Sequence, residues 1–491
     1  MTDEENYSFD VGGFLIIRNA LTSAEIQTYN EAIDKGILDG LSPGDDDFPE
    51  PVAQLRDHPA LSSYLDELTF DGYHLDGLPS LIETSKATHL SCGNEPIDHS
   101  RDYTHQNSIR FAQGIIAIWA LTDVDDGDGG FVFVPASHKS FVETPDDLIA
   151  GGGNTGLVRQ LALKAGDLSI CVESILHGTR PWQSTSKRLL TFTFASEQAQ
   201  RLGKQKKEPP EWIDKLTPEQ RAVVAPTGRP DMAPILVTDG NTSTVRGDTG
   251  VFHPSIYIRN PESGIDEKEF YQWDLCGHLV LKNVMDAEWL AAANEAIDEC
   301  SDLIKVGGDA SKGSKVLAGT GVPSLHGLFE LPDPYGEPFR KMLAHHAIIH
   351  RLNWMMGSGF RLGSARAICS VKGTSGHGLH SGADPAGPVR TYVLQNGRSY
   401  CHSINVAWQL RDVTEADGGF VCIPGSHKAR YPITPGMIVC EEATDLIQHV
   451  EMQAGDVAMF LGAAQTHGAH PWRSDVDRRV ALIGYTSRNI A

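Results

Sequence analysis

The sequence lacks the features that would place it on a membrane or on nucleic acid. No apolar run approaches the roughly 20 residues that a bilayer-spanning helix needs. The acidic amino terminus MTDEENYSFD has neither the basic segment nor the apolar core of a signal peptide. The chain holds 41 Lys and Arg against 64 Asp and Glu, a net charge of −23, which repels phosphate backbones and anionic lipids. The composition therefore predicts a soluble cytoplasmic protein that binds neither nucleic acid nor membrane.

Cysteine pairs are missing as well. The eight cysteines are scattered along the chain, with no CxxC pair and no close cluster. Such spacing is expected of reduced thiols packed in a core, and it argues against a zinc ribbon or a disulfide framework.

A long internal repeat is present. Residues 101–139 align without a gap with residues 390–428 at an offset of 289, and 18 of the 39 positions are identical. The segment that starts at Phe9 resembles the one that starts at Trp273. At 491 residues the chain exceeds the length at which one hydrophobic core stops growing. We therefore predict two domains joined by a Pro-rich, charged tail and linker: 1–200, 201–260 and 261–491.

Each copy has the pattern of a β-rich domain with helices. The runs GIIAIWAL and SINVAWQL are rich in β-forming residues and end at the turn-forming segments DDGDGG and TEADGG. FVFVP and FVCIP follow at once as returning strands. Many short strands with Gly and Pro turns, after an apolar strand and an amphipathic helix, suit a double-sheet jelly roll. The predicted class is α+β, mainly β, with one barrel and flanking helices in each copy.

His467 and Arg478 are candidate site residues. HGAHPW is a predicted turn between two strands, so that a residue before it and one after it can point into the same barrel mouth. In the first copy His177 and Arg188 stand the same eleven residues apart. A buried arginine requires a carboxylate partner, and no acid in the turn serves both copies. A ligand carboxylate is therefore a candidate partner.

These residues resemble the phytanoyl-CoA dioxygenase-like family of iron(II)- and 2-oxoglutarate-dependent oxygenases. The resemblance covers most of each copy and rests on the order of three features: the block DGGFVCIPGSHK, the Trp of VAWQL, and HG followed by Arg at eleven positions. It implies a double-stranded β-helix, the jelly-roll or cupin-like barrel. In that fold iron is held by an HxD pair and a distal His, and an Arg holds the far carboxylate of 2-oxoglutarate.

Transferred residue by residue, the resemblance implies a role for each of five residues. His380 corresponds to the first iron ligand and His467 to the distal ligand. Arg478 corresponds to the 2-oxoglutarate anchor, and Arg479 takes that role if the alignment shifts by one residue. Trp408 corresponds to a wall of the cosubstrate pocket.

The carboxylate of the HxD pair is missing. In HGLHSGADP, residues 377–385, Gly382 stands where Asp is expected, two residues after His380 on the same face of a strand. Asp384 is the nearest carboxylate, and it reaches a shared metal only through a bend, which the surrounding Gly, Ala and Pro permit. Three alternatives stay open: Asp384 ligates iron, water or chloride takes the third position as in halogenating relatives, or no iron binds. His377 is able to replace or assist His380.

The first copy differs from the family's HxD pattern more than the second copy does. At the offset of 289, Ser91 and Gly93 stand at the positions of His380 and Gly382, while His177, Arg188 and Trp119 are kept. His89 could replace the missing imidazole only if the alignment shifts by two residues. We predict that this copy has lost iron and serves as a support, a lid or a binding module.

The sequence therefore predicts a dioxygenase that uses Fe(II), 2-oxoglutarate and O2 to hydroxylate a small or medium organic substrate, with CO2 and succinate as coproducts. A halogenase that binds chloride in place of the carboxylate is the first alternative. A non-catalytic, carboxylate-binding pseudoenzyme is the second. The sequence indicates neither the substrate nor the oligomeric state.

Overall fold

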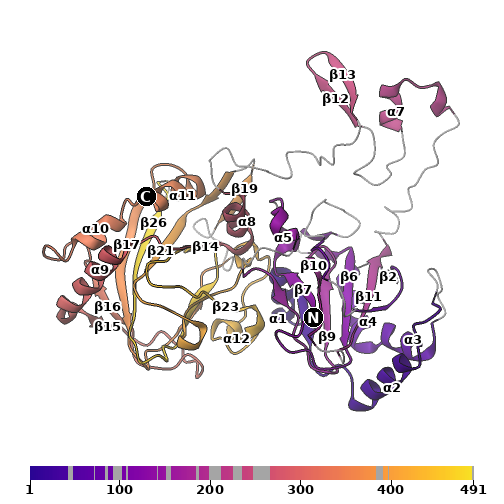
Figure 1. Ribbon diagram of the computed structural model, residues 1–491, viewed down its shortest axis with the longest axis horizontal. Helices are drawn as coiled ribbons and strands as arrows, with labels where there is room; N and C mark the ends of the chain where they lie inside the picture. The colour runs from indigo at the N-terminus through magenta and orange to yellow at the C-terminus, as the bar shows by residue number, and fades with distance from the viewer. Residues whose placement is uncertain are drawn as a thin grey trace. The chain divides into compact units, whose positions relative to one another are not determined.

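The computed structural model divides the chain into two compact units (Figure 1). It describes residues 1–41, 48–70, 72–82, 87–91, 102–106, 109–140, 142–150, 156–183, 187–197, 212–224, 235–246, 266–382, 391–395 and 398–488. Unit 1 comprises Met1–Leu15, Phe133–Arg159 and Arg259–Ala491, and unit 2 comprises Ile16–Val132 and Gln160–Ile258. The units thus differ from the predicted division at 1–200, 201–260 and 261–491.

Buried ion pairs explain why two amino-terminal segments belong to unit 1. Lys139 Nζ lies 2.6 Å from Asp10 and donates to the carbonyl of Lys428. Lys428 Nζ lies 2.7 Å from Asp274 and donates to the carbonyl of Lys139 in return. Buried charges are retained only when they are paired and hydrogen-bonded. These long-range contacts attach segments 1–15 and 133–159 to the carboxy-terminal residues.

Several helices of unit 1 start at side-chain caps. Asp286 caps α9 (Ala287–Glu299) by accepting from the backbone N–H of Trp289 at 2.8 Å. Its buried residues Trp289, Ala293, Ala296 and Ile297 follow the helical period and form one apolar face. The other helices of unit 1 are α1 (Asp3–Gly12), α5 (Asp146–Ile149), α8 (Glu267–Cys276), α10 (Glu337–Met342), α11 (His346–Met356) and α12 (Pro435–Ile438).

Unit 1 contains two antiparallel sheets. The first has seven strands in the order β14-β24-β21-β26-β17-β16-β15, and the second has four in the order β18-β25-β22-β23. A two-stranded pair, β19-β20, lies outside both. The strands are β14 (His278–Leu281), β15 (Lys305–Val306), β16 (Pro323–His326), β17 (Arg361–Ser370), β18 (His377–His380), β19 (Tyr392–Gln395), β20 (Arg398–Cys401), β21 (Ser403–Gln409), β22 (Gly419–Cys422), β23 (Gln448–His449), β24 (Val457–Leu461), β25 (His467–His470) and β26 (Arg478–Thr486).

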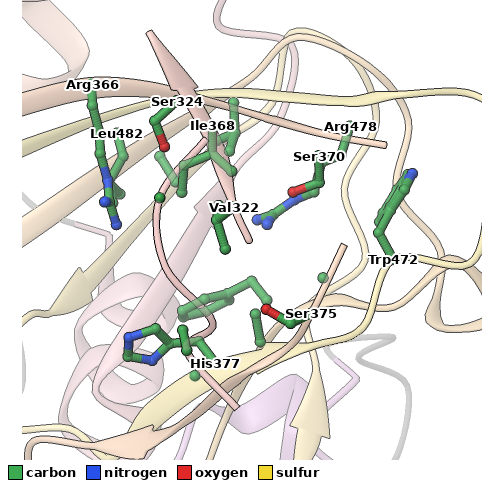
Figure 2. Close-up of a pocket in the computed structure, with 18 of the residues that line it drawn as sticks. Val322, Ser324, Arg366, Ile368, Ser370, Ser375, His377, Trp472, Arg478 and Leu482 are labelled. Atoms are coloured by element: carbon green, nitrogen blue, oxygen red, sulfur yellow. The ribbon is translucent and has the colours of Figure 1, made fainter. Parts of the chain in front are cut away.

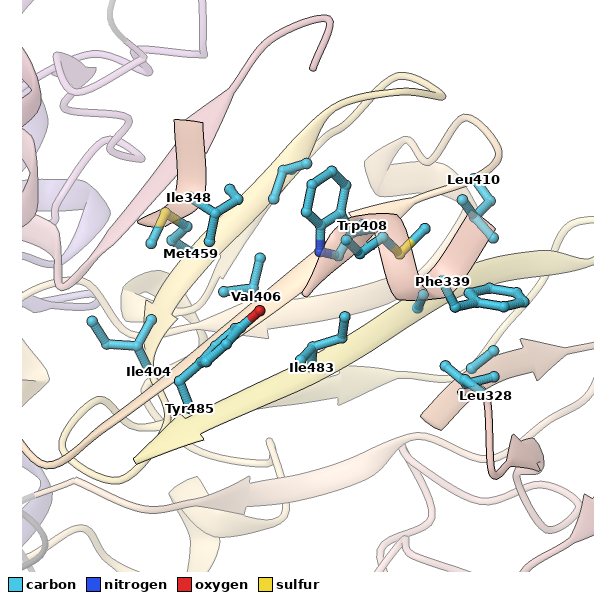
Figure 3. Close-up of a cluster of buried hydrophobic side chains, with 14 of the residues drawn as sticks. Leu328, Phe339, Ile348, Ile404, Val406, Trp408, Leu410, Met459, Ile483 and Tyr485 are labelled. Carbon is cyan, nitrogen blue, oxygen red and sulfur yellow. The ribbon is translucent and has the colours of Figure 1, made fainter. Parts of the chain in front are cut away.

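The seven-stranded sheet has two different faces. Along β21, Ile404, Val406 and Trp408 are buried in the hydrophobic core that Figure 3 shows. Asn405 and Ala407 lie between them on the opposite face, where they line a cavity. The period of two along one strand thus separates the core from the candidate site.

The amino-terminal half repeats this strand order. Its larger sheet runs β1-β9-β6-β11-β2, with β3 also paired to β11, and its smaller sheet runs β10-β7-β8. The strands are β1 (Phe14–Ile17), β2 (Tyr73–Leu75), β3 (Ser80–Leu81), β4 (Tyr103–Gln106), β5 (Ile109–Ala112), β6 (Gly114–Ala120), β7 (Gly130–Val134), β8 (Arg159–Gln160), β9 (Leu168–Val172), β10 (Leu176–Arg180) and β11 (Leu189–Ser196). Helices of unit 2 are α2 (Ser23–Asp34), α3 (Glu50–Arg56), α4 (Pro59–Thr69) and α7 (Pro218–Val224).

The segment predicted as tail and linker contains structure. Besides α7, it includes a hairpin of β12 (Ile235–Asp239) and β13 (Thr242–Arg246), in which Gly240 takes φ +59° at the turn. A two-residue turn that requires positive φ favours Gly and Asn. The hairpin was not predicted.

The observed fold is a mixture of helices and strands in which strands predominate, as predicted. The strands in the described ranges form open sheets, and no closed barrel is found among them. No helix in the same ranges is both long and apolar enough to span a bilayer. The seven described cysteines are all free and buried, and Cys92 lies outside the described residues.

Candidate metal centre

Two predicted metal ligands are cross-strand neighbours. β18 and β25 are antiparallel, and His380 stands directly opposite His467, with ring centroids 4.3 Å apart. His377, at the start of β18, has its ring centroid 4.4 Å from that of His380. The structure therefore brings three imidazoles together at one end of the smaller sheet.

Backbone carbonyls select the tautomers of these imidazoles. Nδ1 of His380 lies 3.1 Å from the carbonyl oxygen of Gly378, and Nδ1 of His467 lies 2.9 Å from that of Gln465. A carbonyl oxygen only accepts, so Nδ1 carries the hydrogen and Nε2 keeps its lone pair. This is the arrangement in which imidazole binds a metal, with the second nitrogen held by a carbonyl.

Burial keeps both imidazoles neutral. Desolvation lowers the pKa of His467 to about 4. Desolvation, with the neighbouring imidazoles His467 and His377, lowers the pKa of His380 to about 3. A metal ligand must be unprotonated, so this environment leaves both rings ready to bind at neutral pH.

The imidazoles open onto a cavity of about 720 Å³ that both sheets of unit 1 line (Figure 2). Residues of β16, β17, β21 and β26 form one wall, and residues of β18, β22 and β25 form the other. Phe420 and Phe460 contribute apolar surface close to His467, with ring centroids 6.1 and 4.9 Å from it. The volume lies in the range of sites that enclose small organic ligands.

Arg478 is the buried cation of this cavity. Its side chain is 7% exposed, and burial lowers its pKa to about 10. Nε has no hydrogen-bond partner, and no ion pair forms with any residue in the described ranges. A Cβ added to Gly419 would lie 3.3 Å from this Nε, so the glycine keeps the space beside the guanidinium open. A buried guanidinium without a protein carboxylate fits an anionic ligand.

The distance between Arg478 and the imidazoles suits a short dicarboxylate. On β22, Gly419 lies beside Arg478 and Cys422 stands opposite His467. Three residues of a strand span about 10 Å. If a five-carbon dicarboxylate binds a metal at the imidazoles with one end, its other carboxylate can extend toward Arg478.

Arg479 points away from the cavity. It donates to Asp298 at 2.6 Å and to the carbonyl of Asn294 at 3.1 Å, on helix α9. Adjacent residues of a strand face opposite sides of the sheet. Arg479 therefore anchors a helix, and the structure does not place it with the candidate site.

The arginine of the first copy corresponds to Arg479, which corrects the sequence alignment by one residue. Arg188 donates to Asp34 at 2.5 Å and to the carbonyl of Asn30 at 3.3 Å, on helix α2. These are the contacts that Arg479 makes with α9. Lys187 therefore stands at the position of Arg478, and the shared spacing of eleven residues does not mark a shared anchor.

Trp408 is also outside the cavity. It is fully buried in the core, with its ring centroid 5.3 Å from that of Trp289 and 5.7 Å from that of His345. Its neighbours Asn405 and Ala407 line the cavity instead. Because side chains alternate along the strand, Trp408 faces the core, and its predicted contact with a cosubstrate is wrong.

The segment after His380 turns sharply. Ser381 and Gly382 both have positive φ, +66° and +91°, so the strand ends at His380. A Cβ at Gly382 would lie 2.3 Å from Thr466 Oγ1. Position 382 is thus closed to a ligand side chain. Asp384 lies outside the described residues, so its predicted role as a ligand remains a prediction.

Within the ranges that the structure describes, no three His, Cys, Asp or Glu side chains are arranged to hold a metal ion. The candidate metal ligands in the described site are the pair His380 and His467, with His377 adjacent. Two imidazoles leave most coordination positions for other ligands.

The first copy lacks one imidazole of the pair. Ser91 forms an isolated antiparallel bridge with His177, at the place that His380 and His467 occupy in the second copy. Phe131 stacks on His177 with ring centroids 5.4 Å apart. At this place the described residues of the copy therefore present one imidazole, and Gly93 lies outside them.

Sequence reasoning missed the contribution of β17. Ser364, Arg366, Ile368 and Ser370 alternate along it and line the cavity. The alternation in RLGSARAICS is the signal that could have identified them.

A family model supplies the functional context of this geometry. Residues 384–480 match the model of phytanoyl-CoA dioxygenase (PhyH). The match includes His467 and Arg478 but begins after His380. It supports an Fe(II)/2-oxoglutarate-dependent oxygenase. No curated protein sequence matches the chain.

Solved structures that are similar to about half of the chain include HygX, EctD and SnoN. HygX from Streptomyces hygroscopicus with nickel and 2-oxoglutarate bound is 17% identical, with a TM-score of 0.39, and the match covers 46% of this chain and 88% of that one. EctD from S. alaskensis with 2-oxoglutarate and 5-hydroxyectoine is 14% identical, with a TM-score of 0.36. That match covers 47% of this chain and 79% of EctD. The epimerase SnoN from nogalamycin biosynthesis is 17% identical, with a TM-score of 0.34. That match covers 45% of this chain and 82% of SnoN.

The PhyH match makes iron(II) and 2-oxoglutarate the groups to test against the site. His380 and His467 offer free Nε2 atoms, which suit iron(II). Arg478 offers an unpartnered Nε in a buried position, which suits a carboxylate. The described residues therefore fit both groups, apart from the third protein ligand.

Proposed function

We propose that the chain is an Fe(II)/2-oxoglutarate-dependent dioxygenase that hydroxylates a small or medium organic substrate in the cavity of unit 1. One observation carries this proposal. The free Nε2 atoms of His380 and His467 and the unpartnered guanidinium of Arg478 face one cavity, at a separation that a five-carbon dicarboxylate spans.

In this proposal, the chain's own residues bind and orient the reactants. His380 and His467 hold iron(II), with their Nδ1 hydrogens fixed by backbone carbonyls. Arg478 binds the far carboxylate of 2-oxoglutarate through its planar fork. Phe420 and Phe460 exclude water beside His467. Bound iron(II) supplies the oxidation of a C–H bond by O2, with succinate and CO2 as coproducts.

Asp384 is proposed as the third protein ligand. The consecutive left-handed residues Ser381 and Gly382 supply the bend that this role requires. The alternative, a halogenase with chloride at the third position, is favoured by one observation: Thr466 Oγ1 occupies the space that a side chain at Gly382 would need.

We also propose that the chain is a tandem of two double-stranded β-helix domains. The two halves share the strand orders β1-β9-β6-β11-β2 and β14-β24-β21-β26-β17. In the first copy, Ser91 and Lys187 replace His380 and Arg478, so this copy is proposed to be a degenerate support that binds no iron.

Succinate formation tests the proposed function. Protein is loaded with iron(II) and 2-oxoglutarate without oxygen, and succinate is measured after oxygen is added, with and without chloride or bromide. We expect succinate from the wild-type protein and at least about tenfold less from His467→Ala. A candidate substrate that gains one oxygen atom in every salt excludes the halogenase, whereas a halogenated product excludes the hydroxylase.

A non-catalytic protein gives a different result in the same assay. If no iron binds and no succinate forms, the cavity is a carboxylate-binding site, and the oxygenase proposal is wrong. In that case 2-oxoglutarate should still bind to the metal-free protein, and Arg478→Gln should abolish the binding.

A further inference from the structure

The described walls of the cavity carry positive charge and no carboxylate. Lys305, Arg366 and Arg478 line it, and none of its described lining residues is Asp or Glu. The whole chain has a net charge of −23, so the charge of the cavity walls is opposite in sign to that of the whole protein. A concave site lined by one sign of charge focuses the potential and concentrates ligands of the opposite sign.

Arg366 is a cation without a protein partner. It forms no hydrogen bond or ion pair with any residue in the described ranges. Arg361, on the same strand, donates instead to the carbonyls of Gly359 and Phe360. Since an arginine carries five N–H donors in a fixed fork, the donors of Arg366 are available to a ligand in the cavity.

Arg366 is separate from the proposed 2-oxoglutarate anchor. Arg478 stands opposite Ser370 in the sheet, whereas Arg366 stands opposite Leu482. Ser370 and Arg366 are four residues apart on β17, which corresponds to about 13 Å. Figure 2 shows Arg366 at the left of the group of lining residues and Arg478 to the right of it. One 2-oxoglutarate therefore leaves Arg366 free.

Arg366 lies on the imidazole side of the cavity. Arg366 and His377 both line the cavity, and Figure 2 shows them on the same side of it, away from Trp472. The ring of His377 is in turn 4.4 Å from that of His380. A ligand group at Arg366 is thus held close to the proposed iron site.

Lys305 continues the same cavity face. It stands opposite Ser324 on β16, and Ser324 stands opposite Ile368 on β17. Directly opposed residues share one face of a sheet, and residue 366 shares that face with residue 368. Lys305 and Arg366 therefore border one region of the cavity.

We propose that Arg366, assisted by Lys305, binds an oxyanion of the substrate, so that the enzyme acts on small organic anions with a carboxylate or phosphate group. The inference rests on the proposed function, because it assigns Arg478 to 2-oxoglutarate. Phe420, Phe460 and Trp472 line the cavity with apolar surface, which fits a hydrocarbon or aromatic body on the same substrate.

Binding to the metal-free full chain tests this inference without requiring turnover. The probes are phenylacetate, phenyl phosphate and the neutral phenylacetamide, measured by calorimetry with 2-oxoglutarate present in excess. Arg366→Gln removes the charge, Arg366→Lys keeps it, and Arg361→Gln is the matched control on the same strand outside the cavity. 2-Oxoglutarate binding is measured separately for each variant.

We expect at least one anionic probe to bind about tenfold more tightly than phenylacetamide. Arg366→Gln should abolish this preference, Arg366→Lys should retain part of it, and Arg361→Gln should leave it unchanged. Preference for phenylacetate identifies a carboxylate substrate, and preference for phenyl phosphate identifies a phosphate ester. Equal binding of the neutral and anionic probes, or an unchanged preference in Arg366→Gln, overturns the inference.

The design separates this inference from the proposed function. If 2-oxoglutarate binds and yields succinate while the anionic probes show no preference, only the substrate class is wrong. If anionic probes bind through Arg366 while iron loading yields no succinate, the oxygenase is wrong and the anion site stands.

Discussion

His380 and His467 face each other across the β18-β25 pair, and each donates its Nδ1 hydrogen to a backbone carbonyl two residues earlier in the chain. The strand pairing sets the distance between the rings, and the carbonyls set their tautomers. If the pair binds a metal as proposed, both ligand atoms are positioned before the metal arrives, which reduces the entropy lost on binding.

Iron binding should depend on this pair. We expect His380→Gln and His467→Gln each to lower the affinity for iron(II) by at least about tenfold, because each removes one of two described imidazole ligands. His449→Gln is the matched control, since His449 lies in the same sheet and its Nε2 contacts His470. Iron stoichiometry after anaerobic loading is the measurement. Equal loss of iron in all three variants would point to a general loss of structure.

The neighbouring arginines should have opposite phenotypes. We expect Arg478→Gln to weaken 2-oxoglutarate binding by at least about tenfold, because it removes charge-assisted hydrogen bonds to a carboxylate. Arg479→Gln should instead lower the free energy of unfolding by roughly 2–4 kcal/mol, because it breaks the pairs with Asp298 and Asp477. Calorimetric titration with 2-oxoglutarate and urea unfolding of both variants check this. Weakened cosubstrate binding in Arg479→Gln with native stability would reverse the assignment.

Restoring the missing carboxylate at position 382 should fail. Gly382→Asp places a side chain at φ +91° and brings its Cβ to 2.3 Å from Thr466 Oγ1. We expect the variant to be destabilised by about 1–3 kcal/mol and to bind iron no more tightly than the wild type. Thermal unfolding and iron titration check both parts.

Asp384→Asn is the matched variant for the third ligand. If Asp384 ligates iron, this variant loses affinity while position 382 is unchanged. Tighter iron binding in Gly382→Asp would show that the segment after His380 can be remodelled into an HxD pair.

The strands could be predicted because their pattern is local. The runs from residue 114 and from residue 403 appear as β6 and β21, at the predicted positions. Apolar β-forming residues between turn-forming segments are sufficient to indicate such strands. The pairing of His380 with His467 was inferred from resemblance, since no local pattern indicates which strands are adjacent.

Features that depend on tertiary contacts were less accessible. The assignment of Arg188 failed because a spacing of eleven residues does not show which of two adjacent cations faces the cavity. Its contacts with Asn30 and Asp34 decide this, and they join residues far apart in the sequence. The compact units differ from the predicted division for a similar reason, because the ion pairs of Lys139 and Lys428 are long-range.

The turn after His380 illustrates an intermediate case. Gly382 was visible as a departure from the HxD pattern. The proximity of Thr466 could not be inferred, because Thr466 immediately precedes β25 and follows Gly382 by more than 80 residues. In contrast, the hairpin β12-β13 carries a local turn signal, DGN, that would have sufficed to predict it.

A buried histidine outside the cavity should contribute to acid sensitivity. His427 Nε2 lies 2.9 Å from the carbonyl oxygen of Asp274, and burial, with the nearby charge of Lys428, lowers the pKa of His427 well below 6.5. The unfolded chain then binds the proton more readily than the folded one. The stabilisation is present above pH 6.5 and is lost as the pH falls from 6.5 toward the folded pKa.

The variant His427→Gln isolates this contribution, because an amide can keep the hydrogen bond to Asp274 without titrating. Between pH 7.5 and 5.5 the wild-type free energy of unfolding should fall by about 1.4 kcal/mol more than that of the variant, since one extra proton binds on unfolding over roughly one pH unit below 6.5. Other buried histidines, such as His138, contribute equally to both proteins and cancel in the difference. Urea unfolding at the two pH values measures it, and identical pH dependence of the two proteins would show that the folded chain accommodates a charged imidazole at position 427.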